Sequence, residues 1–351
     1  MITPNLTLGI GFHAVGAMLS ANCYSPQKYV RRWAWETFWI AQAAWCWLLW
    51  PIIGALATIP NLPAVLAEAP KDCMLASFLM GVAYGVGGTA FNVSIRYIGF
   101  SLTYAIAVGL SSVLGTLIPP LAHGQLGSVL SNAGSEWLIA GIATGALGIA
   151  LCGVAGRWKE IDLARGGTTG EFSLRKGFTL SLVAGLLSAV YGFALDVAAP
   201  IADIAEKHGA GIWKGNVSYL FANTGAFLTA LLYCLYLGRR NRTSGELGHL
   251  AGGDQPARLW INHLLAILTG TLWYGQFFFY NLGHVRLAGK YAFSSWAIHM
   301  IMLVLFSNLV AMMFLEWKGC RRRTQGGIAV ALGVLCTAVV LLTYGNYLGA
   351  R

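Results

Sequence analysis

Ten long apolar stretches, separated by short polar segments, limit what this chain can fold into more than any other feature. They cover residues 5–24, 36–57, 74–95, 101–119, 136–156, 177–199, 216–237, 260–282, 291–314 and 326–348. Each stretch has about the 20 residues that a helix needs to cross a bilayer core of roughly 30 Å. The chain is 57% hydrophobic and only 10% charged, which excludes a soluble enzyme and a disordered protein. We therefore predict an all-α integral membrane protein with ten transmembrane helices.

The basic residues predict how these helices are oriented. Of the 23 Lys and Arg residues, 17 lie in the odd-numbered loops, while the even-numbered loops and the C-terminus hold 6. Basic loops stay on the cytoplasmic side, so both termini are expected to face outward. The charges are spread over five short loops and form no single patch. The net charge of +10 therefore indicates orientation in a lipid membrane and not a nucleic-acid partner.

Matching fragments predict an internal repeat. An offset of 190 residues relates the third stretch to the eighth. The paired fragments are Tyr84-Gly85, Arg96 and Gly99 with Tyr274-Gly275, Arg286 and Gly289. Because five helices are an odd number, the second half would enter the membrane from the opposite side. We therefore expect two inverted five-helix repeats, 1–156 and 177–351, joined by a cytoplasmic linker, 157–176. This design is typical of transporters with a substrate site near the midplane.

Polar and aromatic side chains inside two stretches predict a sugar-binding site. Trp273, Gln276 and Tyr280 follow each other at helical spacing and so share one face. Aromatic rings pack on the C–H face of a sugar, and an amide can both donate to and accept from hydroxyls. Tyr84 and Asn92 offer the same chemistry in the third stretch. The alternatives are an aromatic packing stripe in the eighth stretch and an inter-helix hydrogen bond from Asn92.

Four titratable residues are candidates for coupling transport to protons. His13 and His299 come first, because each lies inside an apolar stretch and histidine titrates near neutral pH. Glu36 and Asp196 follow, near the ends of their stretches. The alternatives are histidines that only hydrogen-bond neighbouring helices, a helix-start acid at Glu36 and a water-facing acid at Asp196.

No motif for soluble chemistry is present. The chain has no Walker loop, HExxH or GxSxG sequence, and its seven cysteines are scattered without a CxxC pair. We expect no metal site, no cofactor and no enzymatic activity. The sequence leaves the oligomeric state open.

Several motifs, in order along most of the chain, resemble the bacterial L-rhamnose–proton symporter family. They are Cys23-Tyr24-Ser25-Pro26, Trp35-Glu36-Thr37-Phe38-Trp39, Arg96-Tyr97-Ile98-Gly99, Phe277-Phe278-Phe279-Tyr280 with Gly283-His284, and Ser295-Trp296 with His299-Met300. The resemblance implies the drug/metabolite transporter fold of ten helices in two inverted repeats. It also implies uptake of L-rhamnose or a similar neutral 6-deoxyhexose by alternating access, driven by protons across a bacterial plasma (inner) membrane.

Seven residues match the family pattern in place, and two positions depart from it. The positions that match the family pattern are His13, Glu36, Tyr280, His284, Arg286, Trp296 and His299. Ala292 stands where the family has an acid, and Asp196 stands where an amide is expected. These departures leave open which sugar is carried and which group carries the proton. The alternative functions are export of amino acids or other small metabolites on the same fold, and a membrane enzyme or sugar sensor.

Overall fold

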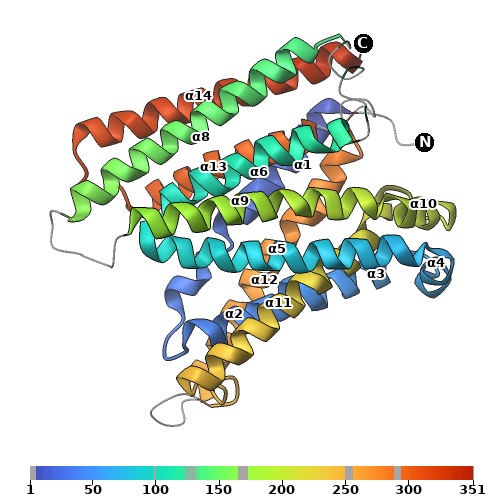
Figure 1. Cartoon of the computed structure of the whole chain (residues 1–351), viewed down its shortest axis with the longest axis horizontal. Helices are drawn as coiled ribbons and strands as arrows, with labels where there is room; N and C mark the ends of the chain where they lie inside the picture. Colours follow the sequence, from blue (N-terminus) through green and yellow to red (C-terminus); the bar gives the residue numbers. More distant parts are fainter. Residues whose placement is uncertain are drawn as a thin grey trace. The chain divides into compact units, whose positions relative to one another are not determined.

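In the computed structural model, the described residues form helices joined by turns and irregular segments, with no strand among them (Figure 1). The structure describes residues 5–98, 100–122, 133–164, 173–249, 256–287 and 294–350, with the single residues 124, 127 and 131. Ala292 and residues 165–172 of the predicted linker lie outside the described residues.

A helix lies over each of the ten apolar stretches. The ten are α1 (Leu6–Asn22), α2 (Trp35–Ala43) continued by η2 (Ala44–Leu49) and α3 (Trp50–Thr58), α5 (Lys71–Ile98), α6 (Phe100–Ala122), α8 (Ser135–Ala164), α9 (Leu174–Val197), α11 (Ser218–Asn241), α12 (Pro256–His284), α13 (Ser294–Met313) and α14 (Arg322–Ala350). Among the described residues, 8 helical segments are long and apolar enough to cross a membrane. The apolar part of α6 is shorter, Leu102–Ile118, and α12 is not among the eight.

The helices gather into two compact units, and each unit contains segments from both halves of the sequence. Unit 1 comprises Met1–Ala21, Gly87–Phe193 and Leu282–Arg351, and unit 2 comprises Asn22–Val86 and Ala194–Asn281. The core of unit 1 lies where α6, α8, α13 and α14 pack together, and α8 runs along α14 (Figure 1). Leu138, Ile301 and Leu335 are fully buried there.

Glycines set the closest helix approaches in both units. In unit 1, a Cβ at Gly148 would lie 2.7 Å from Leu335 Cδ2, so α8 and α14 approach closely there. In unit 2, a Cβ at Gly81 of α5 would overlap the carbonyl oxygen of Ala222 in α11. Small residues permit this kind of approach between membrane helices.

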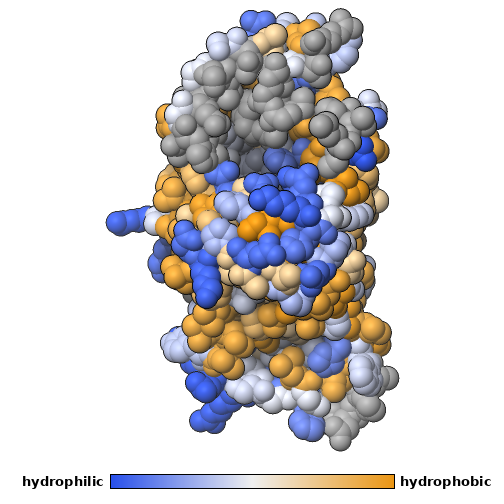
Figure 2. All heavy atoms as spheres, turned by 90° about the vertical axis from the view of Figure 1, so that its right-hand side faces the viewer, coloured by the Kyte–Doolittle hydropathy of each residue, from blue (hydrophilic) through white to orange (hydrophobic). Residues whose placement is uncertain are grey.

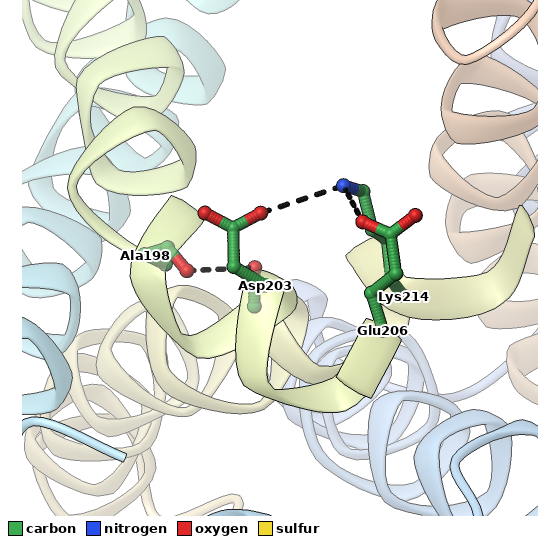
Figure 3. A network of polar contacts seen from close by, with 5 residues as sticks. Ala198, Asp203, Glu206 and Lys214 are labelled. Atoms are coloured by element: carbon green, nitrogen blue, oxygen red, sulfur yellow. Dashed lines mark hydrogen bonds and ion pairs between the residues drawn. The ribbon is translucent and has the colours of Figure 1, made fainter. Parts of the chain in front are cut away.

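Unit 2 also has short helices that were not predicted from the sequence. They are η1 (Pro26–Tyr29), α4 (Leu62–Glu68), α10 (Ala199–Lys207) and η3 (Gly211–Val217). α10 is amphipathic, because it buries Ile201 and Ala205 and exposes Asp203 and Glu206. Figure 2 shows hydrophilic residues gathered over the end of the molecule that carries α4 and α10. The Lys214 ammonium lies between two carboxylates, 3.4 Å from Asp203 and 2.5 Å from Glu206 (Figure 3). This ionic network ties α10 to η3.

Candidate functional site

Unit 2 contains a cluster of aromatic rings around the predicted residue Trp273. The ring centroid of Trp273 lies 5.2 Å from that of Trp47, with the planes at 85°, and 6.3 Å from that of Tyr84. Trp47 and Tyr84 are themselves 6.3 Å apart. The three rings come from α12, η2 and α5, so the two sugar-site residues predicted separately on α5 and α12 lie side by side. Edge-to-face packing of this kind is favourable for aromatic rings.

The other predicted sugar ligands occupy different positions. Gln276 lies on the same face of α12 as Trp273 and is 5% exposed, while Tyr280 is half-buried one turn further. Asn92 belongs to unit 1, and its amide nitrogen donates to the Gly88 carbonyl within α5, at 2.9 Å. This hydrogen bond lies within α5 and does not link Asn92 to another helix.

The two histidines predicted for proton coupling are neighbours in unit 1. His13 on α1 and His299 on α13 are 0% and 2% exposed, and their ring centroids are 5.8 Å apart. His13 Nε2 lies 2.8 Å from Ser295 Oγ, also on α13. Gly283 lets the chain pass close to this ring, since a Cβ there would lie 2.9 Å from His13 Nε2. Histidine titrates near neutral pH, so this buried pair is a candidate site for binding a proton.

The acidic candidates have different surroundings. Glu36 in the first turn of α2 accepts hydrogen bonds on Oε1 from Asn241 Nδ2 and Thr243 Oγ1, each at 2.8 Å. Glu246 reinforces the same helix start, because its Oε2 accepts from the backbone N–H of Ala34 at 2.7 Å. Carboxylates are stabilised at a helix N-terminus, so Glu36 and Glu246 fasten α2 to the segment after α11. Asp196 is half-buried, one residue before the end of α9.

The residues named by the family resemblance are placed as follows. The Trp296 indole N–H donates to the Ser111 carbonyl at 3.1 Å, and the ring is buried in unit 1. His284 and Arg286 are half-buried at the end of α12 and just after it. The Arg286 carbonyl accepts from the Asn5 backbone N–H at 3.0 Å.

Sequence reasoning missed Trp47 as a member of the aromatic cluster. A signal for it was present, because six of the 13 tryptophans fall within residues 33–50. Tryptophans near the start of a span usually anchor it at the membrane surface, so this signal alone does not indicate a ligand site. Among the described residues, no group of three or more His, Cys, Asp or Glu side chains is placed to hold a metal ion.

The long apolar helices indicate a multi-pass membrane protein, and a buried histidine pair with a buried aromatic cluster fits the transporter class. The sequence model of the L-rhamnose-proton symport protein (RhaT) family matches residues 2–349. An L-rhamnose-proton symporter of Mannheimia succiniciproducens is 31% identical over 343 residues, which is 97% of this chain and 98% of that protein. One from Cronobacter sakazakii is 32% identical over 342 residues, again 97% of this chain and 98% of the relative. The chain belongs to the L-rhamnose-proton symport family.

Proposed function

We propose that this protein imports L-rhamnose, or a closely similar neutral 6-deoxyhexose, together with protons. Membership of the L-rhamnose-proton symport family over residues 2–349 is the observation that carries the proposal. The aromatic cluster of unit 2 supports it, because ring faces pack well on the apolar C–H face of a sugar. The proton gradient supplies the driving force, so no cofactor is required.

For the sugar, we assign Trp273, Gln276, Tyr280, Tyr84 and Asn92 as binding residues. Trp273 and Tyr84 would pack on the C–H face of the ring, as their neighbouring positions in unit 2 support. The buried Gln276 amide would exchange hydrogen bonds with hydroxyls. An amide in a membrane span is costly unless it has such partners, which favours a binding role.

For the proton, we assign His13 and His299 as the first carriers, with Glu36 and Asp196 as secondary candidates. The 5.8 Å between the rings of His13 and His299 supports a shared role. A proton on either ring places a charge in a buried position, which changes the relative free energies of the conformations that open to each side. Glu36 ranks lower because its carboxylate is used to fasten the start of α2.

For the architecture, we propose ten transmembrane helices in two inverted repeats, 1–156 and 177–351, linked by the cytoplasmic segment 157–176. The composition of the compact units supports this. Unit 1 holds the first, fourth and fifth apolar stretches with the sixth, ninth and tenth, while unit 2 holds most of the second, third, seventh and eighth. Each stretch therefore lies in the same unit as the stretch five places from it in the order: the first with the sixth, the second with the seventh, and so on. A repeat of five helices requires this pairing. We place the protein in a bacterial plasma membrane with both termini outside.

The test is transport by purified protein in proteoliposomes. Vesicles preloaded with unlabelled L-rhamnose should take up labelled L-rhamnose by counterflow, and an acidic exterior should drive its accumulation. D-Mannitol is the control solute, since it has hydroxyls but no ring. Absence of L-rhamnose counterflow, with the protein folded and inserted, would refute the proposal.

A further inference from the structure

Two buried tryptophans in unit 2 have indole N–H groups for which the described part of the chain offers no acceptor. Trp39 and Trp47 are both 2% exposed, and neither indole nitrogen has a hydrogen-bond partner among the described residues. Two other tryptophans of the same segment do have acceptors. The Trp33 indole donates to the Glu246 carbonyl at 2.8 Å, and the Trp50 indole donates to Thr271 Oγ1 at 3.0 Å. Buried polar groups in native proteins are normally paired, so the two unpaired donors need an explanation.

An unpaired acceptor lies on the same segment. Gln42 is 1% exposed, and its Oε1 has no donor within the described chain. It follows Trp39 by one helical turn, so both side chains leave α2 on the same side. This position therefore combines donors and an acceptor that no described residue satisfies.

The π-helical turn η2 brings Trp47 toward that side. Residues 39 and 47 of a regular α-helix would stand about 80° apart around the axis, because each residue turns the chain by about 100°. A π turn contains more residues than an α turn, so each residue rotates the chain by less than 100°. The angle between residues 39 and 47 is therefore smaller than in a regular α-helix. The ring centroids of Trp39 and Trp47 are 5.9 Å apart, and Trp47 in turn contacts Trp273 and Tyr84. π turns inside helices are frequent at functional sites.

We infer that Trp47 and Gln42 are direct sugar ligands, an inference that rests on the proposed function. The Trp47 indole N–H would donate to one hydroxyl, and the Gln42 carbonyl would accept from a second. A pair of neighbouring sugar hydroxyls matches this arrangement, since each hydroxyl can donate and accept. The rings of Trp47 and Trp273 supply the apolar surface for the C–H face and the methyl group. The ligand class is a neutral sugar with adjacent hydroxyls, because neither side chain carries a charge that would balance a charged substrate.

The test uses Trp47→Phe and Gln42→Met, which remove the polar atom and keep most of the side-chain volume. Loss of one hydrogen bond should raise the KM for L-rhamnose counterflow about three- to tenfold in each variant. Trp50→Phe is the matched control, because it makes the same chemical change at an indole that is already bonded within the protein. Its KM should stay within about twofold of wild type.

Thermal stability without sugar separates a ligand role from a structural role. Replacing an unsatisfied buried polar group removes a desolvation penalty, so Trp47→Phe and Gln42→Met should unfold at the same temperature as wild type or higher. L-Rhamnose should raise the unfolding temperature of wild type more than that of either variant. An unchanged KM in both variants, with wild-type transport intact, would overturn the inference and leave the proposed function standing. A wild-type protein that neither transports L-rhamnose nor is stabilised by it would overturn both.

Discussion

The crossing of α5 and α11 in unit 2 gives the sharpest structural prediction, because backbone atoms and not side chains fill the space. An added Cβ at Gly81 would overlap the Ala222 carbonyl oxygen and lie 2.7 Å from its carbonyl carbon. From the opposite helix, a Cβ at Gly225 would lie 2.7 Å from the Val82 nitrogen. We predict that Gly81→Ala separates the two helices and destabilises the protein.

The size of the effect follows from the distances. Ordinary contacts of a Cβ begin at 3.4 Å, so a distance of 2.7 Å is at least 0.7 Å too short. Forcing extra volume into a packed core costs about 1–3 kcal/mol, and backbone neighbours place this site at the upper end. Moving α5 and α11 apart would also break the 2.9 Å hydrogen bond that Thr229 Oγ1 donates to the Val82 carbonyl. Loss of this bond costs about 1 kcal/mol. Alanine returns about 1 kcal/mol through its higher helix propensity, which leaves a loss of about 3 kcal/mol.

Thermal unfolding of the purified protein in detergent measures this loss. Gly333→Ala on α14 is the control, because a Cβ there meets no atom of the described residues within 4 Å. The control should be as stable as wild type or slightly more so, and Gly81→Ala should unfold well below it. The double variant with Gly225→Ala should lose less than the sum of the single losses, since one separation relieves both overlaps. A Gly81→Ala protein as stable as the Gly333→Ala control would refute the reasoning.

Three further predictions follow. His299→Gln should abolish accumulation of labelled L-rhamnose driven by an acidic exterior while leaving counterflow, and full accumulation would exclude His299 as the proton carrier. Lys159→Met should lower the unfolding temperature, because it removes the 3.2 Å ion pair with the partly exposed Glu316, a loss of about 1–2 kcal/mol in the free energy of unfolding. Lys318→Met, at an exposed position, should leave the unfolding temperature unchanged. Burial raises the pKa of the Cys320 thiol, so less thiolate is present near neutral pH. Its alkylation by iodoacetamide at pH 8 should be slower than in the SDS-denatured protein and should keep rising above pH 9; equal rates would contradict this prediction.

Much of the helical layout could be predicted because each apolar stretch is a local signal. The length that crosses a bilayer can be counted along the chain, and a helix lies over every predicted stretch. The short helices α4 and α10 could not be found in this way. They are too short to show a long apolar run. In α10, the buried apolar residues alternate with charged residues, so the sequence shows no continuous apolar stretch.

The candidate site was predictable only one helix at a time. Helical spacing placed Trp273 and Gln276 on one face, but it could not show that Trp47 meets them from η2. That contact depends on which helices become neighbours and on a local change from α to π geometry. The same holds for His13 and His299, which were chosen separately and whose proximity follows from the packing of α1 on α13.

The composition of the two units has a consequence for how the protein is made. Unit 2 lacks α11 and α12 until synthesis has passed residue 281, and unit 1 lacks α13 and α14 until nearly the whole chain has been made. Helices that emerge early must therefore remain in the lipid as unassembled segments until their partners are inserted, as contacts between distant segments of a chain form late. Expressed alone, residues 1–156 contain neither unit complete. Co-expression of 1–164 and 173–351 as separate chains, which keeps α8 and α9 whole, should restore both units.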